Sequence, residues 1–315
     1  MTSQLSLSVA MCTYNGERFL QEQLDSLTRQ ERLPDELVVC DDGSTDKTWE
    51  ILEKFAEHAP FPVRLYRNEK NLGYNQNFEQ CALKCSGDVI FFCDQDDIWY
   101  PEKIRLHMEI FEKDPEMGMV FSDSEAQGEK TSDSIQRVFG LPKNYRKKLR
   151  KQDMLPFCRR YASWVGHCIS YRTKYHPWLY PLPEPASYDR WIFIALNILE
   201  KTFFLEKVLV VHRIHPQQVT APQQSSVSQK AISYHQMFAE SQEAMAHRLT
   251  QLTLKTHIYI YIYMLLKSSR HYSRRALIRE KQQMGLWYAI LEFLNGGYFR
   301  HSRGFFSFLS DFLRK

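Results

Sequence analysis

The chain has 315 residues, of which 43% are hydrophobic and 25% charged, and its formal net charge at pH 7 is +4. This composition is typical of a globular protein with a substantial core, and it excludes a disordered chain. No nucleic-acid recognition motif accompanies the basic residues, so nucleic acid is not an expected partner.

The start of the sequence and the cysteines both favour the cytoplasm. Residues 1–16 contain no basic stretch followed by a long apolar run, so we expect no signal peptide. Most of the seven cysteines lie in apolar runs, which predicts reduced, buried thiols rather than a disulfide framework. Cys81 and Cys85 share one predicted helix face and lack the partners of a zinc site.

Apolar periodicity predicts that strands and helices alternate in the first third of the chain. Strands separated by helices of this length indicate right-handed crossovers and a mostly parallel sheet, as in nucleotide-binding α/β units. The predicted strands are residues 5–11, 37–40, 63–66, 89–99 and 119–121, and the predicted helices are residues 17–29, 46–58, 74–85 and 104–111.

The stretch VIFFCDQDDIW, residues 89–99, is the most informative. Its apolar run predicts a strand buried on both faces, which places Asp94, Asp96 and Asp97 at the strand's carboxyl end, where open α/β sheets bind ligands. At about 5 Å and an effective dielectric of about 20, each pair of charges repels by about 3 kcal/mol, which a divalent cation would relieve. The alternative is a solvated acidic turn that caps the next helix.

Polar loops follow the other predicted strands. Thr13, Tyr14 and Asn15 follow the first strand, and DDGSTD, residues 41–46, follows the second. A carboxylate at the end of a second strand is well placed to accept hydrogen bonds from a base or ribose, although the same residues also fit a turn and a helix N-cap.

A third loop, residues 68–77, contains Asn71, Gly73, Asn75 and Asn77. The asparagine amides are suited to a pyrophosphate or a sugar, and they are equally suited to organising the loop itself.

Four motifs, in this order and spacing, resemble glycosyltransferase family 2 enzymes of the GT-A fold. They are SVAMCTYNGERFLQEQLDSLTRQ, DDGSTD, NLGYNQNF and FFCDQDDIW. Within the family they look most like bacterial rhamnosyltransferase-like enzymes of surface polysaccharide assembly. The resemblance is strong over residues 5–122 and thinner up to about residue 220.

The resemblance implies a role for each matching residue. Asp41 would hold the edge of uracil or thymine, and Asp94 and Asp96 match the Asp-x-Asp motif, which contacts ribose and holds a divalent metal, Mn²⁺ or Mg²⁺, on the donor diphosphate. Asp97 would shape the site without binding the metal. The nucleotide-sugar-binding set is Thr13, Tyr14, Asn15, Asp41, Asp42, Asn71, Asn75, Asp94, Gln95 and Arg213.

The middle of the chain is expected to form the acceptor half. Residues 124–151 are polar and turn-rich, and residues 143–151 hold six basic side chains and no acidic one. That run is either a solvated face or a contact with acidic head groups or a phosphorylated acceptor. Residues 164–171 resemble the family segment beside the sugar pocket.

Asp189 matches the position of the family's catalytic aspartate, just ahead of a predicted helix at residues 190–199. An inverting transfer needs one carboxylate to take the proton of the acceptor hydroxyl, and the alternative role for Asp189 is a helix N-cap. The predicted strand 203–213 leads into Arg213 and His215. A similar Arg-x-His sequence closes the donor site in the family, so His215 is expected to join the metal or the diphosphate.

From residue 221 the composition changes. A Gln/Ser-rich linker, residues 222–229, precedes a mostly helical pattern. The run 258–266 alternates as a strand does, but its flanks are helix formers, so we expect a helix, which is too short to span a bilayer. The basic, aromatic tail suits either peripheral contact with an anionic membrane or packing on the catalytic domain or a partner subunit. We therefore expect a donor-binding half (1–122), an acceptor-binding and catalytic half (123–220) and a helical extension (221–315).

The sequence thus predicts a metal-dependent, inverting glycosyltransferase with a Rossmann-like α/β fold. The expected donor is dTDP-rhamnose or a UDP-hexose, and the expected acceptor is a saccharide or lipid-linked saccharide. A nucleotidyltransferase is the alternative enzyme class, but the loop after the first strand lacks a Gly-rich phosphate loop with Arg or Lys. A non-catalytic sugar-binding subunit is the third hypothesis, and the set Asp94, Asp96, Asp189 and His215 argues against it.

Overall fold

The computed structural model describes residues 4–128, 165–199, 201–216, 218, 239–240 and 243–248. The chain divides into two compact units: the first comprises Met1–Gln152, Trp164–Leu182 and Tyr188–Val219, and the second Asp153–Ser163, Pro183–Ser187 and Thr220–Lys315. All helices and strands named below belong to the first unit. The basic run 143–151, the linker 222–229, the run 258–266 and the aromatic tail lie outside the described residues, and the division into three parts stays a prediction.

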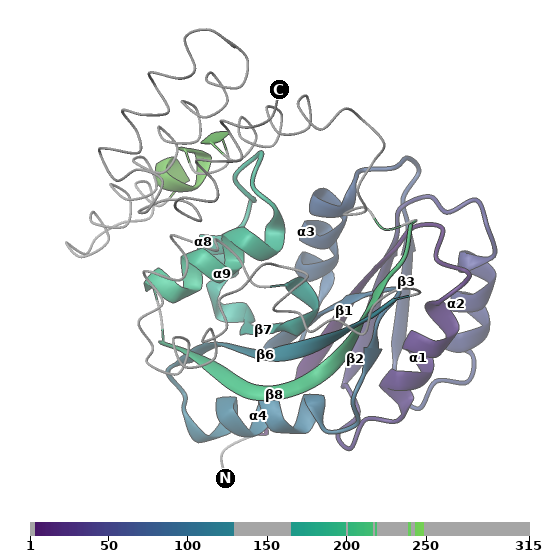
Figure 1. Ribbon diagram of the computed structural model, residues 1–315, viewed down its shortest axis with the longest axis horizontal. Coiled ribbons are helices and arrows are strands. Elements are labelled where there is room, and N and C mark those ends of the chain that lie inside the picture. Colours follow the sequence, from purple (N-terminus) through teal and green to yellow (C-terminus); the bar gives the residue numbers. More distant parts are fainter. Residues whose placement is uncertain are drawn as a thin grey trace, which may run out of the picture. The chain divides into compact units, whose positions relative to one another are not determined.

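Strands and helices alternate through the first part of the chain, as predicted (Figure 1). The later part adds antiparallel strands and the helices that pack beside them. The elements are β1 (Leu7–Thr13), α1 (Leu20–Thr28), β2 (Glu36–Asp41), α2 (Thr48–Ala56), β3 (Val63–Arg67), α3 (Tyr74–Lys84), β4 (Val89–Asp94), β5 (Ile98–Trp99), α4 (Lys103–Lys113), β6 (Met117–Gly128), the 3-10 helix η1 (Gly166–Cys168), β7 (Ile169–Arg172), the 3-10 helix η2 (Thr173–Tyr175), α8 (His176–Leu179), α9 (Tyr188–Leu199) and β8 (Lys201–Ile214).

These strands form one mixed sheet in the order β3-β2-β1-β4-β7-β6-β8-β5. The pairs β2–β3, β1–β2, β1–β4 and β6–β8 are parallel, and β7 lies antiparallel between β4 and β6. The short β5 pairs antiparallel with β8 at the edge. The mostly parallel sheet that the sequence predicts is therefore confirmed.

Strand β4 is buried on both faces, as its apolar run predicts. The ring of Phe92 meets Phe78 of α3 at 5.6 Å between centroids, whereas the ring of Phe91 meets His107 of α4 at 5.4 Å. Because successive side chains of a strand point to opposite faces, α3 and α4 cover opposite faces of the sheet (Figure 1). The aspartates that follow β4 are thus anchored by a core strand.

Two sequence predictions in this region are corrected. The run 89–99 is not one strand, because β4 ends at Asp94 and β5 begins at Ile98 after a turn. Residues 124–128, predicted as turn-rich, continue β6 instead, paired with β8. These residues are polar, so the sequence does not indicate a strand. Their partner strand, β8, lies far along the chain, and the polar side chains of Asp123 and Ser124 are buried in the sheet.

The described cysteines are free thiols, which confirms the expectation of reduced cysteines. Burial raises the pKa of Cys12 to about 11, so this thiol stays protonated at neutral pH. Five of the described thiols are buried: Cys12, Cys40, Cys81, Cys93 and Cys168. The sixth, Cys85, is half-buried.

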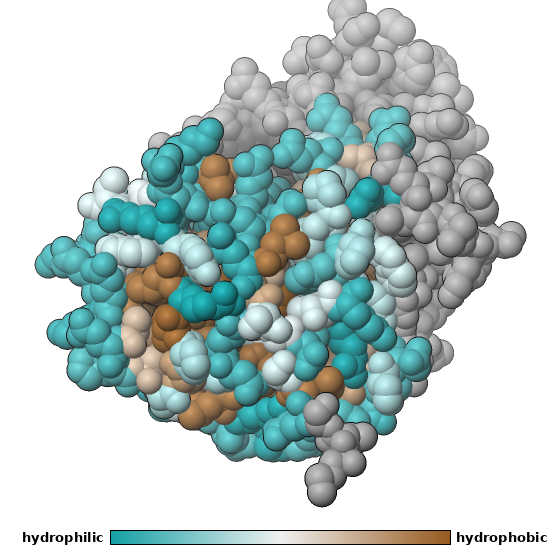
Figure 2. Space-filling view, turned by 180° about the vertical axis from the view of Figure 1, so that it is seen from behind, coloured by the Kyte–Doolittle hydropathy of each residue, from teal (hydrophilic) through white to brown (hydrophobic). Residues whose placement is uncertain are grey.

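The surface of the described residues carries scattered apolar side chains. Figure 2 shows the rear face, where hydrophobic residues are interspersed with hydrophilic ones. Single exposed apolar residues of this kind are normal for a folded protein. None of the described helices is long and apolar enough to cross a membrane.

Glu36, at the start of β2, is a buried carboxylate held by hydrogen bonds. Its Oε1 accepts bonds from the Ser8 hydroxyl (2.6 Å) and the Ser86 amide (2.6 Å), and Arg64 Nε donates to Oε2 (2.9 Å). Burial alone would raise the pKa of Glu36, but these bonds together hold it below its usual value of 4.5. A carboxyl with a depressed pKa stabilises the folded state above the unfolded pKa and loses that contribution as the pH falls through the folded pKa.

We therefore expect Glu36→Gln to lower the free energy of unfolding by about 1–3 kcal/mol at pH 7. The loss should shrink as the pH falls below 4.5, which urea denaturation between pH 3 and pH 7 measures. Glu50→Gln, at an exposed position of α2, is the control and should show neither effect. A loss for Glu36→Gln that is constant with pH would contradict the charge-based account.

Candidate functional site

The predicted donor loops converge at one edge of the sheet. The register pairs Thr13 at the end of β1 with Asp41 at the end of β2, and Cys12 with Asp94 at the end of β4. Because parallel strands end at the same edge, the three loops that follow these strands lie side by side. The convergence expected from the sequence is therefore present in the fold.

Asp41 lies at the floor of the first two loops. It is fully buried, and its carboxylate accepts hydrogen bonds from Thr13 Oγ1 (2.9 Å) and from the backbone N–H of Ser44 (2.9 Å). Arg67 Nε lies 3.7 Å from the same carboxylate. These contacts fix the carboxylate between the ends of β1 and β2. Tyr14, the residue after Thr13, is 47% exposed.

Asp42 organises the third loop. Its carboxylate accepts the backbone N–H groups of Leu72 (2.8 Å) and Gly73 (2.9 Å), and Asn71 Nδ2 donates to its carbonyl oxygen (3.3 Å). Gly73 has φ +80°, a conformation that glycine adopts without strain. Asp42 and Asn71 therefore have a structural role, and their contact with a donor stays a prediction.

Gln95 joins the aspartate turn, residues 94–97, to the loop after β1. Its Oε1 accepts the Tyr14 N–H (2.8 Å) and its Nε2 donates to the Tyr14 carbonyl (3.0 Å). A Cβ on Gly16 would lie 2.2 Å from Gln95 Oε1, so a larger residue there would displace the end of this side chain. Asn15, with φ 48°, accepts the Thr45 N–H at 2.8 Å and so ties the first two loops together.

Each carboxylate of the aspartate turn faces an imidazole. From the sequence we expect a divalent cation to relieve the repulsion among these carboxylates. In the structure, histidines from η1, from β8 and from the position after β8 lie beside them. The nitrogen-to-oxygen distances are 3.2 Å for His167–Asp94, 3.0 Å for His167–Asp97, 2.9 Å for His212–Asp97 and 2.9 Å for His215–Asp96.

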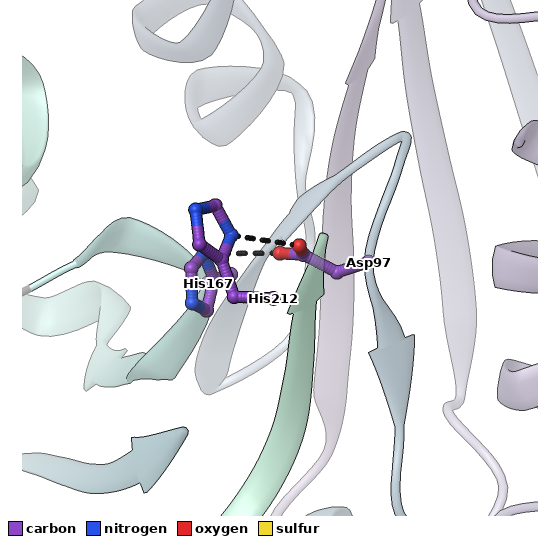
Figure 3. Close-up of side chains that lie close together, drawn as sticks. All are labelled: Asp97, His167 and His212. Atoms are coloured by element: carbon purple, nitrogen blue, oxygen red, sulfur yellow. Dashed lines mark hydrogen bonds and ion pairs between the residues drawn. The ribbon is translucent and has the colours of Figure 1, made fainter. Parts of the chain in front are cut away.

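Asp97 lies between His167 and His212 and is fully buried (Figure 3). Burial alone would raise the pKa of Asp97, but the two imidazoles hold it well below its usual range. Burial would likewise lower the pKa of His167, and the carboxylate of Asp97 raises it well above its usual value instead. The backbone N–H of Arg213 also donates to Asp97 Oδ1 (3.3 Å).

These three side chains form the one group of at least three metal-ligating residues found in the described part of the chain, with ligand atoms within 4.8 Å of one another. Their geometry nevertheless fits a hydrogen-bonded ion cluster better than a metal centre. The two rings stack at 4.7 Å with an interplanar angle of 19°, and each Nδ1 meets a different oxygen of Asp97 (Figure 3). The side chains of His167 and Asp97 are almost fully enclosed and that of His212 is largely so, which leaves a donor diphosphate little access to this group.

Lys103 holds the backbone of His167, one of the residues of the cluster. It is fully buried at the start of α4, where its Nζ donates to the His167 carbonyl (2.5 Å) and lies 3.3 Å from the centre of the Trp99 ring. Burial lowers the pKa of Lys103 to about 8. His167 is therefore held through its ring by Asp97 and through its backbone by Lys103.

Asp96 and His215 are partly accessible, and Asp94 is more so, with a side chain 31% exposed. The side chains of Asp96 and His215 are 14% and 10% exposed, whereas that of Asp97 is fully buried. Burial raises the pKa of Asp96, and the charges of Asp97 and Asp94 add to this effect. Adjacent ligands of an octahedral ion, each about 2.1 Å from it, lie about 3 Å apart, so the 2.9 Å between Asp96 Oδ2 and His215 Nε2 fits such an ion.

Arg213 lies near the end of β8, and His215 is the first residue after the strand. The His215 ring lies 4.5 Å from the Phe19 ring, and the Arg213 guanidinium lies 5.1 Å from the same ring and pairs with Glu22. This arrangement brings both predicted residues of the Arg-x-His sequence to the aspartate turn.

Asp189 lies in the first turn of α9, which begins at Tyr188. It is therefore not the residue before the helix, which corrects the N-cap alternative. Its Oδ1 accepts the backbone N–H of Arg190 (2.7 Å), and Asn75 Oδ1 accepts the N–H of Tyr188 (2.9 Å). Asn75 thus joins the start of α3 to the start of α9, a role that the loop sequence did not indicate.

The sequence analysis missed His167, His212 and Tyr188 as site residues. His212 directly precedes Arg213 on β8. His167 lies inside the segment 164–171, which the resemblance puts beside the sugar pocket. A search for histidines near these two segments would have found both. The described part of that segment, residues 165–171, comprises η1 and the beginning of β7.

A family model described as glycosyl transferase family 2 matches residues 8–172, more than half of the chain. The chain belongs to glycosyltransferase family 2. One similar curated protein is an uncharacterised glycosyltransferase of Nostoc sp., 24% identical over 59% of this chain and 65% of that protein. The dTDP-rhamnosyl transferase RfbG of Shigella flexneri is 36% identical over 30% of this chain and 34% of RfbG. The UDP-Glc:alpha-D-GlcNAc-diphosphoundecaprenol beta-1,3-glucosyltransferase WfaP of Escherichia coli is 28% identical over 68% of this chain and 80% of WfaP. The chain thus spans less than two thirds of the first two.

Solved structures share the fold of this family 2 chain. TarS of S. aureus has a TM-score of 0.61 at 18% identity, covering 87% of this chain and 47% of TarS. The mannosyltransferase PcManGT of Pyrobaculum calidifontis, in complex with GDP-Man and Mn²⁺, has a TM-score of 0.58 at 16% identity, covering 94% of this chain and 81% of that protein. The GT-A fold expected from the sequence is confirmed.

Proposed function

We propose that this family 2 chain is a metal-dependent, inverting glycosyltransferase of bacterial surface polysaccharide synthesis. It transfers a sugar from dTDP-rhamnose or a UDP-hexose to a saccharide or lipid-linked saccharide. The observation that carries this proposal is the contact of Asp96 with His215, two metal-ligating side chains 119 residues apart that meet at 2.9 Å beside the donor loops. The donors named for RfbG and WfaP support the choice of nucleotide sugar.

The donor nucleotide lies on the loops after β1 and β2 in this proposal. Asp41, oriented by Thr13, recognises the base edge, and the exposed ring of Tyr14 covers it. The solved complexes of TarS with UDP-GlcNAc and of PcManGT with GDP-Man support a nucleotide-sugar donor. Arg213, whose guanidinium forms a planar fork, faces the diphosphate.

Asp96 and His215, which already meet, would hold the divalent metal, and Asp94 would join them after a small rearrangement, because the ligand atoms of these three residues do not all lie within 4.8 Å of one another. Carboxylate oxygens and an imidazole nitrogen form a donor set suited to Mn²⁺. Bound there, Mn²⁺ or Mg²⁺ supplies positive charge that stabilises the leaving diphosphate. Asp97 remains outside this set because its carboxylate is fully buried beside His167 and His212.

Asp189 acts as the base. Its carboxylate accepts the proton of an acceptor hydroxyl while that oxygen attacks the anomeric carbon from the side opposite the diphosphate. The amino terminus of α9 favours the ionised carboxylate through the helix dipole. Asn75 positions this terminus by accepting the N–H of Tyr188.

The cellular setting follows from the lipid-linked acceptor. The enzyme works in the cytoplasm at the inner face of the membrane, which the basic run 143–151 and the basic tail contact peripherally. The family match argues against the nucleotidyltransferase alternative.

The metal assignment predicts a specific loss of binding. The parent protein should bind UDP or dTDP more tightly with Mn²⁺ than with EDTA, and Asp96→Ala should lose roughly 10–100-fold of the metal-dependent affinity. Asp25→Ala on α1 is the matched control and should keep it. Calorimetry measures both, with circular dichroism to verify folding. An undiminished metal effect in Asp96→Ala would refute the assignment.

The base assignment predicts a loss of turnover without a loss of donor binding. Asp189→Asn keeps the size of the side chain and its hydrogen bond to Arg190, so the protein should fold and bind the nucleotide sugar normally. Turnover should fall by roughly 100-fold or more because the amide cannot take the proton. A near-normal rate in Asp189→Asn, together with early melting of Asp189→Ala, would show that Asp189 only stabilises α9.

A further inference from the structure

Tyr188 is a buried residue with an unpartnered hydroxyl. Its side chain is 5% exposed, and its backbone N–H donates to Asn75. Among the residues that the structure describes, no hydrogen bond to the Tyr188 hydroxyl is found. The hydroxyl oxygen is not one of the fully enclosed side-chain atoms that lack a partner among the described residues, so it stays open to solvent or to a ligand.

The ring of Tyr188 is held rigidly. It stacks on Phe78 at 4.1 Å and 20°, and it meets Phe92 edge-on at 4.9 Å and 70°. Both partners belong to the core between α3 and β4, so the orientation of the hydroxyl is fixed by packing. The unpartnered group is therefore aimed in one direction by the fold.

The hydroxyl points to Gly166 at the start of η1. A Cβ added to Gly166 would lie 2.1 Å from the Tyr188 oxygen, so glycine is required there. The next residue, His167, contacts Asp94 at 3.2 Å. The hydroxyl thus reaches from the amino terminus of α9 toward the segment that supports the aspartate turn.

Tyr188 precedes Asp189 in the chain, and its hydroxyl faces Gly166, the residue before the His167 that contacts Asp94. Burial raises the pKa of Tyr188 well above its usual value, and the charges of Asp94 and Asp189 raise it further. The phenol therefore stays neutral and able to donate. In an inverting transfer the anomeric carbon lies between the leaving diphosphate and the attacking hydroxyl, hence between the aspartate turn and Asp189.

We propose that the Tyr188 hydroxyl hydrogen-bonds a hydroxyl group of the transferred sugar and so determines which nucleotide sugar the enzyme accepts. This inference rests on the proposed function, because it takes Asp94 as the diphosphate side and Asp189 as the acceptor side. A site built to bond a substrate hydroxyl discriminates strongly against an analogue that lacks it or turns it away. Tyr188 is thus a specificity-determining residue that contacts the donor sugar.

The test compares nucleotide sugars with their nucleoside diphosphates. Calorimetry in Mn²⁺ gives the Kd of UDP, dTDP and GDP and of UDP-glucose, UDP-N-acetylglucosamine, dTDP-rhamnose and GDP-mannose. Tyr188→Phe keeps the stacked ring and removes only the hydroxyl. It should leave the Kd of each nucleoside diphosphate unchanged and raise the Kd of the preferred nucleotide sugar roughly tenfold. The differences in Kd among the four nucleotide sugars should become smaller.

Thermal melting separates this role from a structural one. Because its hydroxyl has no protein partner, Tyr188→Phe should melt at or above the temperature of the parent. Tyr180→Phe is the matched control: its hydroxyl bonds that of Tyr171 at 2.8 Å, so it should melt earlier without altering sugar preference. Gly166→Ala, which displaces the Tyr188 hydroxyl, should reproduce the loss of preference.

The outcomes separate the inference from the proposed function. Intact nucleoside diphosphate binding with the same sugar preference in Tyr188→Phe would overturn the inference alone. Earlier melting of Tyr188→Phe would also overturn it, since the hydroxyl would then have a structural partner. A parent protein that binds none of these nucleotides in Mn²⁺ would overturn the proposed function and the inference together.

Discussion

A buried carboxylate holds together three parts of the chain that are distant in sequence. Asp97, in the turn between β4 and β5, pairs with His167 of η1 at 3.0 Å and with His212 of β8 at 2.9 Å. A buried charge is costly unless it is paired, so each partner is needed where it lies. Because β8 is fixed in this way, Arg213 and His215 reach the aspartate turn. The geometry of the site therefore depends on a group that we do not place in contact with the substrate.

Close packing around two glycines completes this arrangement. Gly16 leaves room for Gln95, whose amide bonds both backbone groups of Tyr14, and Gly166 leaves room for the Tyr188 hydroxyl. Larger residues would displace the Gln95 amide in the first case and the ring of Tyr188 in the second. The sheet brings the loops after β1, β2 and β4 to one edge. The contacts of Gln95 and Tyr188 then help to position these loops and the start of α9 relative to one another.

The sequence was sufficient for the parts that local patterns govern. Apolar periodicity predicted the elements up to residue 122 except the separate strand β5, and the run before Asp94 correctly indicated a strand buried on both faces. It could not reveal the pairing of β6 with β8, because that pairing joins segments far apart in the chain. For the same reason the carboxylates were assigned a metal as their only counter-charge, while the pairing of β5 with β8 places His212 beside Asp97.

The central claim is that the accessible pair Asp96–His215 holds the metal and the buried Asp97 cluster does not. The most direct test is a crystal structure of the full chain grown with Mn²⁺ and UDP, with the ion located by its anomalous scattering. The account predicts one Mn²⁺ bound by Asp96 and His215, about 2.1 Å from each ligand atom and in contact with the diphosphate. An ion bound instead by Asp97, His167 and His212 would contradict it.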